Sequence, residues 1–191
     1  MASIKLKGDT SGELTITVPA VAGTNTLTLP ASTGSIIVNT TGGDETNTGF
    51  GDDALDAITT GSSNSAFGAE ALTSNTTANQ NTAVGRYALR QTTTGSNNVA
   101  MGYASLIQNT TGIGNTAYGH NSLYNTTANN NTAVGTNAAV ANTTGTQNTS
   151  VGASALTANT TANYNTAVGA SALVVNTTGA QNTAVGSFSL Q

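Results

Sequence analysis

The chain has 191 residues, of which 37% are hydrophobic and only 6% charged, and it carries a formal net charge of −4 and no cysteine. A typical globular domain is about 45–50% apolar and about 25% charged. Such a chain excludes a disulfide framework, and without a basic patch it is poorly suited to bind nucleic acid or anionic lipid. The low charge is also atypical of a self-repelling disordered chain. The abundant Asn, Thr, Gly and Ala favour a regular solenoid instead.

The first 46 residues differ from the rest of the chain. Apolar and polar residues alternate over 14–18, 27–29 and 36–38, and Pro19 and Pro30 interrupt them. This pattern predicts three short strands in a small N-terminal β module, joined by a linker over 39–49 to the remainder of the chain. No apolar run is long enough for a signal peptide or a membrane span, so we expect synthesis in a cytoplasm.

A 17-residue repeat occupies residues 47–191. Its consensus is N-T-A-V-G-x-x-A-L-x-x-N-T-T-x-x-x, and successive glycines at its fifth position are 17 residues apart, except for one interval of 16. Nine coherent copies are a strong signal of a repeat architecture. The fifth-position glycines are Gly51, Gly68, Gly85, Gly102, Gly119, Gly135, Gly152, Gly169 and Gly186.

The residues of the repeat favour strands and turns over helices, because Gly, Asn and Thr are poor in helix interiors. We therefore predict an all-β fold, a parallel β-solenoid of 17-residue coils with two short strands per coil at "TAV" and "AL". Stacked coils place like residues over like, so the first-position asparagines form a ladder of side-chain amides. The ladder comprises Asn47, Asn64, Asn81, Asn98, Asn115, Asn131, Asn148, Asn165 and Asn182.

Neighbouring residues of a strand point to opposite faces. Both residues of "AV" and of "AL" are apolar, so a lone solenoid is expected to carry two outward aliphatic stripes. We infer a homo-oligomer, with three-fold symmetry as the preferred arrangement, whose core and trimer interface use the fourth and ninth positions. These residues are Phe50, Leu55, Phe67, Leu72, Val84, Leu89, Met101, Leu106, Leu123, Val134, Val151, Leu156, Val168, Leu173, Val185 and Leu190, with Ala139 in place of one leucine.

The phrases "NTAVG" and "NSAFG" resemble the head repeats of trimeric autotransporter adhesins, which are trimers of left-handed parallel β-rolls. They also resemble the Asn/Thr/Gly repeats of bacteriophage fibre proteins. The segment "GELTITVPAVAGTNTLTLPASTGSIIV" is similar to one found near the start of phage tail-fibre proteins. An autotransporter carries a signal peptide and a membrane barrel, and its head repeat is shorter than 17 residues. The resemblance therefore implies a phage virion fibre, made in the host cytoplasm.

Charged groups give little indication of a catalytic or metal site. The only histidine, His120, lies at a variable position where we expect surface or turn. Asp52, Asp53 and Asp56 form the single acidic cluster, which we interpret as a solvated first coil, because Ca²⁺ needs six or more oxygens in a defined loop. The stretch "GIGNTA" at 112–117 belongs to the repeat and follows no βα pattern. We predict no enzyme activity, no metal and no cofactor.

Two further sets of residues admit a functional or a structural interpretation. Asn75, Asn109 and Asn159 lie in "NTT" glycosylation sequons, which we take as by-products of the repeat. Arg86, Tyr87 and Arg90 occupy outward variable positions of one coil, where a small ligand patch is conceivable and a solvated face is favoured.

The preferred function is thus a structural fibre whose residues 1–46 dock to capsid or tail proteins and whose rod attaches to host-surface glycans or proteins. An ice-binding solenoid is an alternative, although it needs two Thr ranks on one face and "TAV" pairs Thr with Val. A cell-surface adhesin is another. A polysaccharide-degrading solenoid is disfavoured, since no paired carboxylates follow Glu70.

Overall fold

A computed structural model of the chain describes residues 2–7, 13–18, 34–37 and 47–190, and these form strands and turns with no helix. The chain divides into two units, Met1–Ser32 and Thr33–Gln191. The second unit is a parallel β-solenoid built from the 17-residue repeat, which confirms the predicted all-β solenoid class.

In the first unit, β1 (Ala2–Lys7) pairs antiparallel with β2 (Glu13–Val18), and Ile4 lies opposite Ile16. Strand β2 matches the prediction over 14–18. Strand β1 was not predicted, although Ile4 and Leu6 alternate with lysines as a strand requires. The strand predicted over 27–29 lies outside the described residues.

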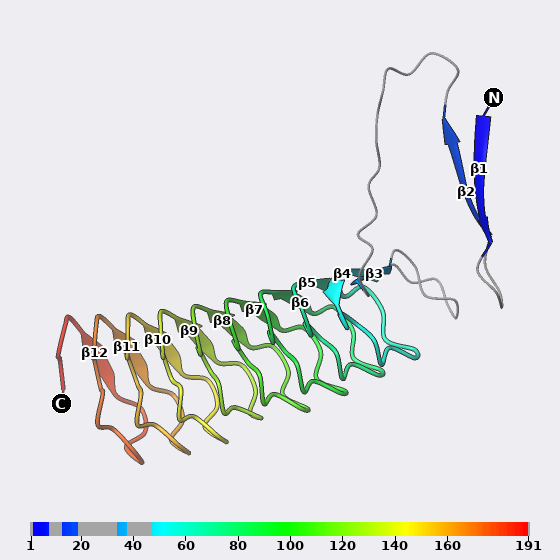
Figure 1. The fold of residues 1–191 in the computed structure, drawn as a ribbon. Helices are drawn as coiled ribbons and strands as arrows, with labels where there is room; N and C mark the ends of the chain where they lie inside the picture. The colour runs from blue at the N-terminus through cyan, green and yellow to red at the C-terminus, as the bar shows by residue number, and fades with distance from the viewer. Residues whose placement is uncertain (1, 8–12, 19–33, 38–46, 191) are drawn as a thin grey trace. The chain divides into compact units, whose positions relative to one another are not determined.

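The second unit contains a ten-stranded sheet in which the strands follow one another in chain order (Figure 1). Strand β3 (Gly34–Ile37) pairs antiparallel with β4 (Thr48–Asp52), and every later pair is parallel, with each repeat position above its equivalent. The later strands are β5 (Ser65–Phe67), β6 (Thr82–Val84), β7 (Val99–Met101), β8 (Thr116–Tyr118), β9 (Thr132–Val134), β10 (Thr149–Val151), β11 (Thr166–Val168) and β12 (Thr183–Val185).

Each coil has one strand, so the second strand predicted at "AL" was wrong. The ninth residue has left-handed backbone geometry, with φ between 48° and 57° from Leu55 to Leu190. Two other positions of the coil share this geometry: the seventh residue, and the residue before the ladder asparagine. An extended strand cannot pass through a left-handed residue, and "AL" therefore lies in a turn.

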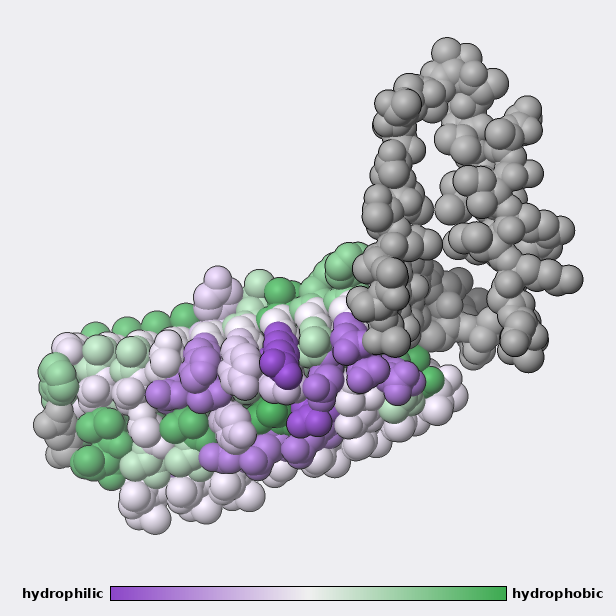
Figure 2. All heavy atoms as spheres, in the orientation of Figure 1, coloured by the Kyte–Doolittle hydropathy of each residue, from purple (hydrophilic) through white to green (hydrophobic). Residues whose placement is uncertain are grey.

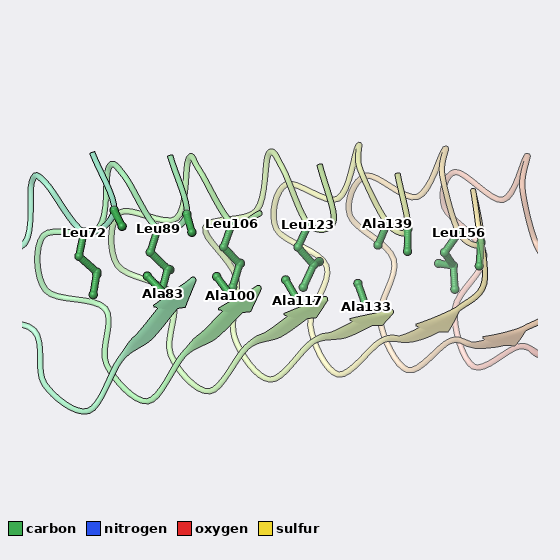
Figure 3. Close-up of a cluster of buried hydrophobic side chains, with 14 of the residues drawn as sticks. Leu72, Ala83, Leu89, Ala100, Leu106, Ala117, Leu123, Ala133, Ala139 and Leu156 are labelled. Atoms are coloured by element: carbon green, nitrogen blue, oxygen red, sulfur yellow. The ribbon is translucent and has the colours of Figure 1, made fainter. Parts of the chain in front are cut away.

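The solenoid core is built from small residues of the strand and larger residues of this turn. Figure 3 shows leucines at the ninth position pointing toward third-position alanines such as Ala83 and Ala100. Ala66, Ala88 and Leu89 are fully buried, as are their counterparts in most coils. Ala139 replaces a leucine in one coil and is equally enclosed at 2% exposure. The alanines allow the strand and the turn to pack closely across a narrow interior.

The fifth position needs glycine for two separate reasons. Its φ lies between 120° and 141°, a region that side chains rarely adopt. In addition, a Cβ at Gly102 would stand 2.6 Å from the carbonyl oxygen of Gly119 in the next coil. Gly186 in the last described coil has the same backbone geometry, with φ of 120°, but a Cβ there would meet nothing within 4 Å.

These two glycines separate backbone strain from contact between coils. We expect Gly102→Ala to lower the free energy of unfolding by more than about 3 kcal/mol, because strain of about 1–3 kcal/mol adds to a backbone clash. Gly186→Ala is expected to show the strain alone. Urea unfolding followed by circular dichroism measures both variants. Equal losses would contradict a stacking role for this position.

Candidate functional site

The ladder asparagines connect each coil to the next through their side-chain amides. The Oδ1 atom of Asn47 accepts a hydrogen bond from the backbone N–H of Asn64 at 2.9 Å, and the Nδ2 atom of Asn47 donates to the Gly61 carbonyl at 2.7 Å. In the same way, each later ladder asparagine from Asn64 to Asn165 accepts a hydrogen bond from the backbone N–H of the next one, the last donor being Asn182. Asn47 to Asn165 are at most 2% exposed. The side chain thus links its own coil to the next in the interior.

A second set of buried asparagines holds the "NTT" corner. Asn75, Asn109 and Asn159 are fully buried, and each Nδ2 atom donates to the carbonyl three residues later, at 3.1–3.3 Å. These are the sequon asparagines, so in the folded chain their Nδ2 atoms are enclosed and already hydrogen-bonded, whereas the Oδ1 atoms of Asn109 and Asn159 have no partner among the described residues. Their repetition has a structural cause, which is the satisfaction of buried backbone carbonyls at the corner.

The outward face of the parallel sheet carries two ranks of side chains. Strand residues alternate, so that the third position is buried while the second and fourth point outward. The fourth position is the more apolar rank, and Phe50 and Tyr118 are 57% and 56% exposed. We call this rank the outward stripe; it comprises Phe50, Phe67, Val84, Met101, Tyr118, Val134, Val151, Val168 and Val185.

The solenoid has one such stripe, and the expectation of two was wrong. The ninth-position leucines from Leu55 to Leu156 are fully buried, and Leu173 is 4% exposed. They lie inside the coil because the left-handed turn directs both "A" and "L" inward, whereas a strand would have placed them on opposite faces. Leu190, in the last described coil, is the exception at 58% exposure. The leucines therefore form core, and of the two positions predicted for the interface only the fourth faces outward.

The acidic residues of the first coil remain at the surface. Asp52 ends β4, and Asp53 and Asp56 lie exposed in the following turn. Among the described residues, no group of three or more His, Cys, Asp or Glu side chains is arranged to hold a metal ion. The "GIGNTA" segment runs into β8 as an ordinary part of its coil.

Arg86, Tyr87 and Arg90 belong to a larger cluster that extends over neighbouring coils. The rings of Tyr87 and Tyr103 meet edge to face with centroids 5.6 Å apart, and Tyr103 stacks on His120 at 5.4 Å. The guanidinium groups of both arginines lie over the Tyr87 ring. This grouping was not predicted from the sequence, although Arg86, Tyr103 and His120 share one repeat position and could have been aligned.

Hydrophilic and apolar residues are unevenly distributed along the solenoid. On the face drawn in Figure 2, the most hydrophilic residues gather on the middle and N-terminal coils, while the C-terminal coils are mostly neutral or apolar. This agrees with the sequence, in which every Asp, Glu, Lys and Arg precedes residue 91. In the described coils, the Asp, Glu, Lys and Arg side chains that could pair with a charged ligand therefore lie only before residue 91.

No family model matches the chain, and no curated protein or solved structure matches it significantly. In the described part of the chain, no helix has the length and apolar character needed to traverse a bilayer.

The amide ladder is tested by removing one amide. In Asn81→Ala, the Gly95 carbonyl and the Asn98 N–H lose partners at 2.9 Å each. A buried group left unpaired costs about 1–3 kcal/mol, so we expect a loss of about 2–6 kcal/mol in the free energy of unfolding. The exposed Gln91→Ala removes an amide outside the ladder and should change stability by less than about 0.5 kcal/mol. Similar values for both variants in urea unfolding would refute the structural role of the ladder.

Proposed function

We propose that the chain is a structural fibre protein of a bacteriophage virion, in which three copies of the solenoid pack side by side into a rod. Residues 1–46 anchor the rod to capsid or tail proteins, and its surface attaches to the host. The outward stripe carries this proposal: nine apolar or aromatic residues follow one another on a single sheet face, six of them 36% or more exposed.

The stripe is suited to contact between copies of the same chain. An uninterrupted apolar stripe is more than a soluble monomer usually exposes. The stripe contains no charged residue, so burying it against a second copy desolvates no ion. Because each rank repeats at the strand spacing of about 4.8 Å, copies in parallel register bring every fourth-position side chain opposite its equivalent.

Parallel packing also suits attachment by one end. A fibre that docks through residues 1–46 needs these segments of all its copies at the same end, and only a parallel assembly provides this. The resemblance of "NTAVG" and of the N-terminal segment to phage fibre proteins supports the same orientation. The sparse charge of the coils is consistent with a rod stabilised by backbone hydrogen bonds and not by ion pairs.

Sedimentation and cross-linking test the proposal directly. We expect a particle mass of three times 18.8 kDa. Since the chain has no cysteine, Val168→Cys supplies a single thiol, and in a parallel trimer it should join two subunits on oxidation or with a short bis-maleimide. Val175→Cys is the control, because Val175 is 61% exposed, against 36% for Val168, but lies outside the stripe. A stable monomer, or stronger cross-linking at 175, would contradict the proposal.

The virion assignment has its own test. A gold label at residue 2 is expected at the base of the fibres on particles that carry the protein. A label at the far tip would overturn the proposed anchoring, and the absence of label from particles would overturn the virion assignment itself.

An ice-binding role is the second candidate, because second-position threonines and fourth-position valines form two outward ranks on one face of the sheet. The Thr rank is interrupted by Val99, and the other rank is uneven at Phe67 and Tyr118. A face covered by sister chains is also inaccessible to ice. Thermal hysteresis in the purified protein would favour this role over the fibre.

A further inference from the structure

The aromatic cluster forms a row along the solenoid that the repeat itself does not require. Tyr87, Tyr103 and His120 come from three consecutive coils, and the stacked rings of Tyr103 and His120 are nearly parallel, with an angle of 11° between their planes. Tyr103 is 47% exposed, and His120 is also exposed. None of them contributes to the core, so their packing has a consequence only at the surface.

The row of rings ends at His120, and smaller side chains follow it in the next coils. The next residues in the same rank are Thr136, Ala153 and Ala170, all small and exposed. The coil of Thr136 lies directly next to that of His120, as the hydrogen bond from Asn137 N–H to the His120 carbonyl at 2.9 Å shows. A threonine side chain is smaller than an imidazole ring. The face of the His120 ring that is turned away from Tyr103 is therefore left partly uncovered, next to these small side chains.

The two arginines beside the row are not equivalent. Arg90 forms an ion pair with Glu70 at 2.8 Å and is neutralised by it. Arg86 is exposed, with its guanidinium 4.4 Å from the centre of the Tyr87 ring. No carboxylate in the described part of the chain pairs with Arg86. The row thus has one uncompensated cation, held at one end by its contact with Tyr87.

This combination fits an acidic sugar chain better than other ligands. The C–H face of a pyranose stacks on an aromatic ring, and a guanidinium binds a carboxylate through paired hydrogen bonds. Arg86 and His120 are two coils apart, about 10 Å at the strand spacing, which suits consecutive sugars more than one compact molecule. Single-stranded nucleic acid also stacks on aromatic rings, but it needs several cations, whereas this row offers one, next to Glu70.

We propose that Arg86, Tyr87, Tyr103 and His120 form a binding site for a carboxylated oligosaccharide that runs along the solenoid axis. One sugar stacks on the uncovered face of the His120 ring, and a carboxylate of the oligosaccharide reaches Arg86. This inference gives a ligand class to the host attachment proposed above and rests on that role.

The sole histidine of the chain provides a single-site probe. The full-length protein is titrated with trigalacturonate, and the imidazole C–H signals of His120 are followed by nuclear magnetic resonance. We expect a saturable shift that trigalacturonate methyl ester, which is neutral, produces at least about tenfold more weakly. No shift up to about 10 mM, well above a weak dissociation constant of about 1 mM, would overturn the proposal, as would equal binding of the ester.

Matched variants separate the site from overall charge. Arg86→Gln and Lys7→Gln each remove one positive charge, and Lys7 lies in β1 of the first unit. We expect Arg86→Gln to weaken trigalacturonate binding about tenfold and Lys7→Gln to leave it within twofold. Equal effects would refute a local site. A shift of the His120 signals with oligothymidylate and not with trigalacturonate would identify the ligand as nucleic acid and overturn the glycan proposal.

The same samples distinguish this inference from the fibre proposal. Sedimentation reports assembly, and the His120 signals report ligand binding. A trimer without a His120 response contradicts the glycan site alone. A monomer that still binds trigalacturonate contradicts the fibre assembly and leaves the site in place.

Discussion

The buried asparagine amide is the interaction on which the solenoid depends. A coil of 17 residues encloses too little apolar volume to fold alone, so its backbone groups must find partners in the next coil. The asparagine side chain supplies an acceptor to the following coil and a donor to its own. Aspartate lacks the donor and would bury a charge, and serine is too short to span the same gap. This explains why the first position never varies.

The ladder also fixes the register of the stack. A slip of one residue would bring a threonine against the amide and turn the alternate strand residues over, which in this sheet would exchange buried Ala83 for the outward-facing, half-buried Val84. Parallel short strands alone would tolerate such a slip poorly but would not forbid it. The asparagine ladder, the fifth-position glycine and the third-position alanine each favour a single register between neighbouring coils, and all three favour the same one.

The repeat and its class of fold could be predicted from the sequence because identical residues recur at a constant interval. The conformation of the ninth position could not, because an apolar pair such as Ala88–Leu89 fits a strand as well as a buried turn. Only the backbone shows that Leu89 is left-handed, with φ of 50°. The inferred second stripe depended on that one angle. Short-range alternation is informative only where the backbone is extended.

The cluster at Arg86, Tyr103 and His120 was missed for a different reason. A consensus gives weight to the positions that repeat, whereas these residues occupy a position that does not. Once one coil stacks on the next, residues 17 apart become neighbours, and the variable positions form columns as regular as those of the core. Residues that share a variable position of the repeat therefore lie next to one another on the surface of the solenoid.

The end of the sheet at β3 shows how the growth of such a stack can be limited. A parallel solenoid presents an unpaired strand edge at each end, and an unpaired edge invites addition of another chain. At β4 that edge is occupied by β3, which runs antiparallel and places Ile36 beside Phe50. Because β3 lacks the repeat pattern, a further coil cannot stack there by the rules that join the others. Addition of a further coil at this end is thereby blocked, while the outward stripe stays exposed along the face of the sheet.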